Sequence, residues 1–168
     1  MEHLWAAWRM SYIRDAVEGA SEPGECIFCE LPKVGDDSSA LILTRGSKNF
    51  MLLNAYPYNS GHTMVAPFRH VGKIEDLDHE ESVELFALVQ QAAAALRDAY
   101  SPDGMNIGMN LGRIAGAGFP GHLHMHLVPR WSGDTNFMPV LGDTRVIPES
   151  LPATYDRLQA VLGEAGDV

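Results

Sequence analysis

Apolar and polar positions along this 168-residue chain alternate between short apolar runs and one long segment of helical period. Short apolar runs bounded by turn residues, such as the Asn59-Ser60-Gly61 cluster, are typical of strands. These runs lie at 40–45, 50–55, 62–67 and 105–111, and a fifth follows Gly121. The pattern therefore predicts a sheet of about five strands.

The helical period begins at Asp78, where apolar residues recur at intervals of three and four, and it predicts a helix to about Tyr100. Asp78 and Glu81 have the spacing of an N-cap and its capping box. Weaker patterns predict a helix over 1–16 and another over 151–162. This order indicates an α+β fold, in which the long helix covers one face of an antiparallel sheet.

Composition restricts the class of protein. Hydrophobic residues make up 46% of the chain, which suits one domain over 1–168 with its own core. There is no apolar run of membrane-spanning length, and the first 16 residues lack the features of a secretory signal, so we expect a cytoplasmic protein. A formal net charge of −10 argues against nucleic acid as a partner.

Three histidines alternate with apolar residues in the sequence GHLHMHLVPRW. On a strand, His122, His124 and His126 would share one face while the intervening side chains enter the core. Such a row spans about 13 Å, so at most two neighbours can share one metal ion and the three must have different roles. A neutral imidazole can also attack phosphorus. The ordinary alternative is a strand whose solvent face is merely polar.

The glycine-rich loop before these histidines contains Gly116-x-Gly118-x-x-Gly121. A dinucleotide-binding fingerprint would lead into a helix, whereas this loop leads into a predicted strand, so the match is coincidental. Its backbone amides could still surround an anion, and Arg113 and Arg130 are candidate phosphate partners. An ordinary turn is the alternative.

The only two cysteines form the Cys26-x-x-Cys29 pair. They lie too close in sequence to cross-link the fold, and cytosolic thiols usually stay reduced. Metal binding, redox chemistry and two unreactive buried thiols remain open on this motif alone.

Taken together, the motifs resemble the histidine triad (HIT) superfamily of nucleotidyl hydrolases and transferases. The resemblance rests on the triad, on Asn110 with the AGAG loop, and on Asn54 with PYNSGHTMVAP, and it covers about residues 26–131. The flanking sequences HLWAAWRMSYI and VPRWSGDTNFMPV resemble the bacterial diadenosine tetraphosphate (Ap4A) phosphorylase branch. A HIT-like fold is therefore expected.

The resemblance implies a role for each matching residue. His124 would attack the α-phosphorus and form a nucleotidyl-histidine, while His126 contacts phosphate and His62 supports it. The substrate-binding positions would be Asn54 at the ribose, Asn110 and Gly118 at the phosphates, and Trp131 as a cover over the substrate or a core residue. Many members have Gln or Ser at the position of Gly118, so backbone amides would replace that side chain here.

The resemblance also implies a structural zinc ion held by Cys26, Cys29, His70 and His122, no organic cofactor, and a homodimer paired through the long helix and an edge strand. The expected activity is cleavage of dinucleoside polyphosphates, with phosphate or water as the acceptor. Two alternatives stay open: a purine nucleoside phosphoramidase that uses the same residues, and a nucleotide-binding or sensing module with little turnover.

Overall fold

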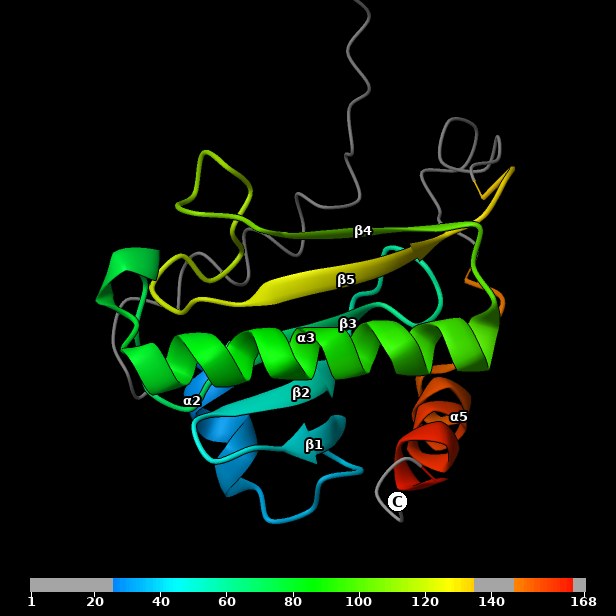
Figure 1. Cartoon of the computed structure of the whole chain (residues 1–168), viewed down its shortest axis with the longest axis horizontal. Helices are drawn as coiled ribbons and strands as arrows, with labels where there is room; N and C mark the ends of the chain where they lie inside the picture. The colour runs from blue at the N-terminus through cyan, green and yellow to red at the C-terminus, as the bar shows by residue number, and fades with distance from the viewer. Residues whose placement is uncertain (1–25, 135–146, 165–168) are drawn as a thin grey trace, which may run out of the picture.

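The computed structural model describes residues 26–134 and 147–164. Five antiparallel strands form one sheet in the order β1-β2-β3-β5-β4 (Figure 1). The strands are β1 (Ile42–Arg45), β2 (Asn49–Leu53), β3 (Thr63–Pro67), β4 (Gly104–Met109) and β5 (Met125–Arg130). The predicted α+β class and the five strands are confirmed, whereas the predicted helix over 1–16 lies outside the described residues.

Two helices match their predicted positions, α3 (His79–Tyr100) and α5 (Leu151–Glu164). The Asp78 carboxylate accepts from the Glu81 N–H at 2.7 Å, and the Glu81 carboxylate accepts from the Asp78 N–H at 2.9 Å. The predicted capping box is therefore confirmed, and it satisfies two backbone donors at the start of α3. No helix within 26–134 or 147–164 has the length and hydropathy needed to cross a membrane.

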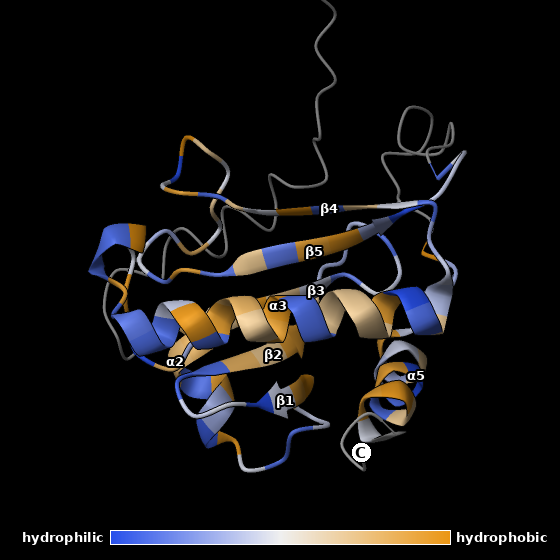
Figure 2. Cartoon of the chain, viewed as in Figure 1, coloured by the Kyte–Doolittle hydropathy of each residue, from blue (hydrophilic) through white to orange (hydrophobic). Residues whose placement is uncertain are grey.

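Helix α3 lies across one face of the sheet, and α5 packs against α3 and β1 (Figure 1). The buried side chains between them alternate along the strands, as period-two burial requires. They include Met51, Leu53, Val65, Met125 and Leu127 from the sheet and Leu85, Leu88, Leu96 and Leu158 from the helices. Figure 2 shows the same strands as largely hydrophobic.

The intervening strand residues form a second core on the opposite face of the sheet. Phe50, Leu52, Met64 and Ala66 pack there against Cys26 and Phe28 of the first described segment and Phe119 of the loop before β5. That segment continues into the short helix α2 (Ile27–Glu30) and the 3-10 turn η2 (Leu31–Lys33). Because His126 pairs directly with Met64 across β5 and β3, His126 belongs to this second face.

Glu84 of α3 connects the helix to the turn between β1 and β2. Its carboxylate accepts from the backbone amides of Ser47, Lys48 and Asn49 at 2.6–2.7 Å, and from the Ser47 hydroxyl and the Asn49 side-chain amide. Burial raises its pKa, but these hydrogen bonds outweigh burial and lower the pKa to about 2. The turn is thus fixed to α3 by a charged acceptor.

One local prediction needed correction, and the structure has short elements that the sequence did not predict. Strand β5 begins at Met125, so His122 and His124 lie just before it and not on it. The physical reason is that this segment bonds elsewhere, with the Leu123 N–H donated to the Val71 carbonyl at 2.7 Å. Helix α2 and the 3-10 turn η3 (Ile74–Asp76) were not predicted, because each is too short to show a period.

Candidate active site and metal centre

His124 is buried, with 6% of its surface exposed, and its ring orientation is fixed by the main chain. Its Nδ1 lies 2.8 Å from the carbonyl oxygen of His122. Since a carbonyl can only accept, Nδ1 carries the proton and Nε2 carries the lone pair. Burial lowers the pKa of His124, and the bond to the carbonyl offsets this only in part, so the ring stays neutral and nucleophilic at physiological pH.

A second set of hydrogen bonds fixes the tautomers of His62 and His126. The Tyr58 N–H donates to Nδ1 of His62 at 3.1 Å, so the proton of a neutral His62 is on Nε2. Nε2 of His62 lies 3.0 Å from Nδ1 of His126 and donates to it. A neutral His126 therefore carries its own proton on Nε2. The structure thus brings His62, His124 and His126 together. The ring centroids of His124 and His126 lie 4.8 Å apart.

Aromatic residues that the sequence analysis did not single out cover this group. Phe28 stacks on His124 with centroids 4.7 Å apart and contacts His122 at 5.2 Å. Tyr58 lies over His62, with centroids 4.7 Å apart. The expected row of imidazoles along a surface is therefore largely buried: His122 is 1% exposed and His124 6%, whereas His126 is half-buried. From the sequence, these two aromatic residues could have been found only by their closeness to the motifs: Phe28 lies inside the Cys-x-x-Cys motif, and Tyr58 lies four residues before His62.

Cys26, Cys29, His70 and His122 come together from three separate segments, and their ligand atoms lie within 4.8 Å of one another. Cys26 Sγ lies 3.3 Å from His122 Nδ1, and Cys29 Sγ lies 3.3 Å from His70 Nδ1. A tetrahedral ion with normal Zn–S and Zn–N bonds separates such atoms by about 3.5 Å. These four residues can hold a metal ion.

The protonation pattern around His122 suits a metal ligand. Its Nε2 donates to the Pro67 carbonyl at 2.8 Å, which leaves Nδ1 unprotonated and facing the cysteines. Burial lowers the pKa of His122 to about 4, so the ring is neutral. Burial and the neighbouring Cys26 raise the pKa of Cys29 to about 11, and a bound cation would favour its thiolate.

The predicted substrate-binding residues lie on the loops around these histidines. Asn54 follows β2, where its N–H donates to the His62 carbonyl at 2.9 Å and its side-chain oxygen accepts from the Tyr56 N–H. Asn110 Nδ2 donates to the Gly116 carbonyl at 3.4 Å and so closes the glycine-rich loop. Gly118 lies in that loop between the buried Ala117 and Phe119.

The two arginines considered as phosphate partners lie in different settings. Arg113 is exposed on the turn of the glycine-rich loop. Arg130 instead forms a salt bridge with Asp134, through Nε at 2.5 Å and Nη2 at 2.9 Å, and its Nη1 donates to Asn106. Arg130 therefore has a structural partner that the sequence did not reveal.

Trp131, the candidate cover over the substrate, packs edge-on against Tyr100, with ring centroids 6.3 Å apart.

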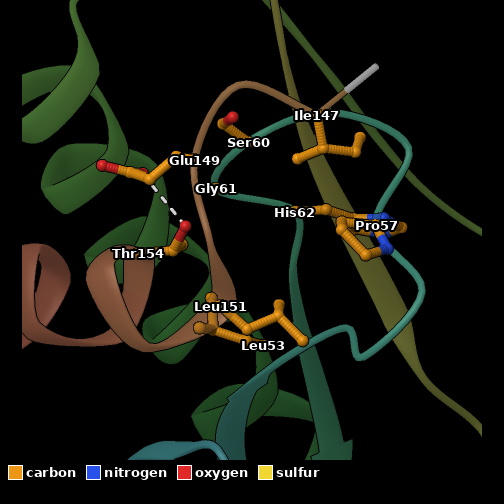
Figure 3. A pocket seen from close by; sticks show the side chains of 9 residues that line it. All are labelled: Leu53, Pro57, Ser60, Gly61, His62, Ile147, Glu149, Leu151 and Thr154. Atoms are coloured by element: carbon orange, nitrogen blue, oxygen red, sulfur yellow. Dashed lines mark hydrogen bonds between the residues drawn. The ribbon is translucent and has the colours of Figure 1, made fainter. Parts of the chain in front are cut away.

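A small cavity lies behind His62, between the loop that precedes β3 and the start of α5 (Figure 3). Its polar lining includes Ser60, Glu149 and Thr154, and the Thr154 hydroxyl donates to Glu149 at 3.0 Å. Within the described part of the chain, the buried Ser60 hydroxyl has no hydrogen-bond partner. The cavity has room for about one water molecule, so it is not a substrate site.

Comparisons with known proteins agree with this geometry. The HIT domain pattern matches residues 37–133. The AP-4-A phosphorylase of Mycobacterium tuberculosis H37Rv is 40% identical over 159 residues, which cover 92% of this chain and 80% of that protein.

Solved structures show the same likeness. A zinc-bound histidine triad family protein from Mycobacterium smegmatis superposes with a TM-score of 0.68 at 26% identity, covering 86% of this chain and 98% of that one. A hypothetical histidine triad nucleotide-binding protein from Sulfolobus tokodaii superposes with a TM-score of 0.63 at 27% identity, covering 83% and 91%.

Proposed function

This chain belongs to the HIT family, and on that basis we propose that it is an enzyme that cleaves dinucleoside polyphosphates such as Ap4A at the α-phosphate. The observation that carries the proposal is the orientation of His124. Its Nδ1–H is donated to the His122 carbonyl at 2.8 Å, which leaves Nε2 unprotonated and able to act as the nucleophile. A buried neutral imidazole in this tautomer is an activated nucleophile.

In the first step, Nε2 of His124 bonds to the α-phosphorus and the bond from that phosphorus to the bridging oxygen breaks. ATP leaves, and AMP remains attached to the histidine. His126 carries a proton on Nε2 and can donate it to a phosphoryl oxygen, while His62 holds that tautomer through its 3.0 Å bond. Asn54 would contact the ribose hydroxyls, and Asn110, Gly118 and Arg113 the phosphates.

In the second step, an acceptor attacks the same phosphorus and restores His124. Inorganic phosphate would give ADP, whereas water would give AMP. We favour phosphate, because the mycobacterial relative is named a phosphorylase and is similar over most of this chain. Trp131, which packs edge-on against Tyr100, is kept as a candidate cover over the nucleotide.

We propose that the metal held by Cys26, Cys29, His70 and His122 is zinc. Two thiolates and two imidazoles form the closed tetrahedral set that structural zinc prefers, and the neighbour from M. smegmatis is zinc-bound. Zinc bound there would cross-link α2, through its N-cap Cys26 and through Cys29, to the chain after β3 and to the triad. A pair of reduced cysteines in this set also suits a cytoplasmic location.

We further propose a homodimer that forms through α3 and β4. Strand β4 lies at one edge of the sheet, and its Ile107 is 48% exposed. On α3, Val83 and Phe86 are 56% and 59% exposed, and Figure 2 shows apolar residues on the outward side of that helix. Among the described strands β4 pairs only with β5, and an open edge together with exposed apolar side chains suits pairing with a second copy.

The test is to incubate the purified protein with Ap4A, with and without inorganic phosphate, and to separate the products by chromatography. Phosphate-dependent ADP and ATP would support phosphorolysis, and AMP and ATP regardless of phosphate would support hydrolysis. His124→Ala should abolish turnover, whereas the exposed His79→Ala serves as a matched control with full activity. Wild-type protein without turnover of Ap4A would refute the proposal; activity on AMP-amides would then identify a phosphoramidase, and nucleotide binding alone a sensing module.

A further inference from the structure

The loop from Asn54 to His62 carries two residues of the proposed site, one at each end. The two ends are joined by the Asn54 N–H bond to the His62 carbonyl at 2.9 Å. Inside the loop, the Tyr58 N–H sets the tautomer of His62, and the Asn59 carbonyl accepts from the His62 N–H at 3.2 Å. The position of the whole loop therefore decides where the His62 ring meets His126.

Asn59 attaches the middle of this loop to a distant part of the chain. It is 9% exposed, and its Nδ2 donates to the Pro129 carbonyl at 3.0 Å and to Asp134 Oδ2 at 2.9 Å. Both hydrogens of the amide are thus used, in contacts that span 70 and 75 residues. Bonds of this kind oppose movement of the loop away from β5.

Asp134 lies at the centre of four donors. Besides Asn59, it accepts from Nε and Nη2 of Arg130 and from the Trp131 N–H at 3.3 Å. The Arg130 guanidinium holds the pKa of the Asp134 carboxyl far below its ordinary value, so the acceptor is charged. The Asp134 side chain is 10% exposed, and little water competes for it.

We propose that Asn59 and Asp134 are positioning residues for the reaction: together they hold the Asn54–His62 loop on β5, so that His62 can fix the proton of His126. This inference rests on the proposed function only for its effect on turnover. The hydrogen bonds themselves do not depend on the substrate.

The experiment compares Asn59→Ala and Asp134→Asn with wild type and with Asp37→Asn. Asp37 is a matched control, because it too accepts from Nε and Nη2 of an arginine, Arg45, at the opposite edge of the sheet. Long-range ¹H–¹⁵N spectra without nucleotide report which ring nitrogen of each histidine is protonated. Turnover of Ap4A and thermal unfolding are measured on the same samples.

In wild type we expect protons on Nε2 of His62 and His126 and on Nδ1 of His124. Both variants should average the His62 and His126 signals between tautomers, leave His124 unchanged, and lower kcat by about tenfold to hundredfold with a smaller change in KM. Asp37→Asn should match wild type. His124 is an internal control, because its acceptor is the His122 carbonyl.

The proposal would be overturned if both variants kept the tautomers and the kcat of wild type. If only Asn59→Ala had an effect, the role given to Asp134 would be wrong. If Asn59→Ala does not fold, Asp134→Asn decides, because it keeps the Pro129 bond of Asn59. Absence of turnover in wild type would refute the proposed function, whereas the spectra would still test the attachment of the loop.

Discussion

Replacing Glu84 by Gln tests how strongly the turn between β1 and β2 is fixed to α3. The carboxylate receives three backbone amides at 2.6–2.7 Å, and its pKa falls from an ordinary 4.5 to about 2. This lowering of the Glu84 pKa corresponds to about 3 kcal/mol of folding free energy. Glu84→Gln should therefore lose up to about 3 kcal/mol at neutral pH.

The sign of the pH dependence follows from the direction of the pKa change. Because the folded-state pKa of Glu84 lies below the unfolded value, its stabilisation is fully present above pH 4.5 and is lost as the pH falls toward 2. Wild type and Glu84→Gln should therefore differ most at pH 7 and converge near pH 2. Other acidic groups titrate in the same range, but they are common to both proteins and cancel in the difference.

The assay is urea unfolding followed by circular dichroism at pH 7, 5 and 3. Glu80→Gln is the matched control on the same helix turn. Within 26–134 and 147–164 the one ion pair of Glu80 is its exposed salt bridge with Lys48, so this substitution should cost at most about 0.5 kcal/mol. A loss of less than about 0.5 kcal/mol for Glu84→Gln at pH 7, or an equal loss at pH 7 and pH 3, would show that the carboxylate does not fix the turn.

Three further predictions concern the site and its support. Cys29→Ser should lower bound zinc from one equivalent per chain to a small fraction, measured by elemental analysis after dialysis; full retention of zinc would exclude Cys29 as a ligand. Phe28→Leu removes the ring stacked on His124 and should lower kcat more than tenfold while costing about 1–2 kcal/mol in stability; an unchanged kcat would mean that the stacking does not orient the nucleophile. Gly61→Ala should cost about 1–3 kcal/mol, because Gly61 has φ 77° and a new Cβ would lie 3.0 Å from Leu96 Cδ2; urea midpoints equal to wild type would contradict this.

Periodicity and short motifs predicted the parts of the fold that depend on local chemistry. The capping box of Asp78 and Glu81 follows from sequence spacing alone, as does the inward direction of Met125 and Leu127. The start of β5 could not be predicted in this way. The bond from Leu123 to Val71 that diverts the chain there depends on tertiary packing, and no local pattern encodes it.

The site shows the same division. The motifs identified the four candidate metal ligands and the group formed by His62, His124 and His126, because those side chains are chemically distinctive. Phe28, Asn59 and Asp134 were missed, since a phenylalanine, an asparagine and an aspartate are common residues that acquire a role only from a partner many residues away. Arg130 was taken for a phosphate partner because its charge was visible in the sequence and its salt bridge was not.

The acceptor that sets the tautomer of His124 is the main-chain oxygen of His122, and every amino acid at position 122 would supply the same atom. His122 therefore has two separable parts: a ring that can be exchanged and a carbonyl that cannot. A substitution at position 122 can remove a ligand of the proposed metal site without deleting the acceptor that orients the proposed nucleophile. A variant could therefore lose the proposed metal while the His124 ring keeps its proton on Nδ1, provided that the packing of the segment is preserved.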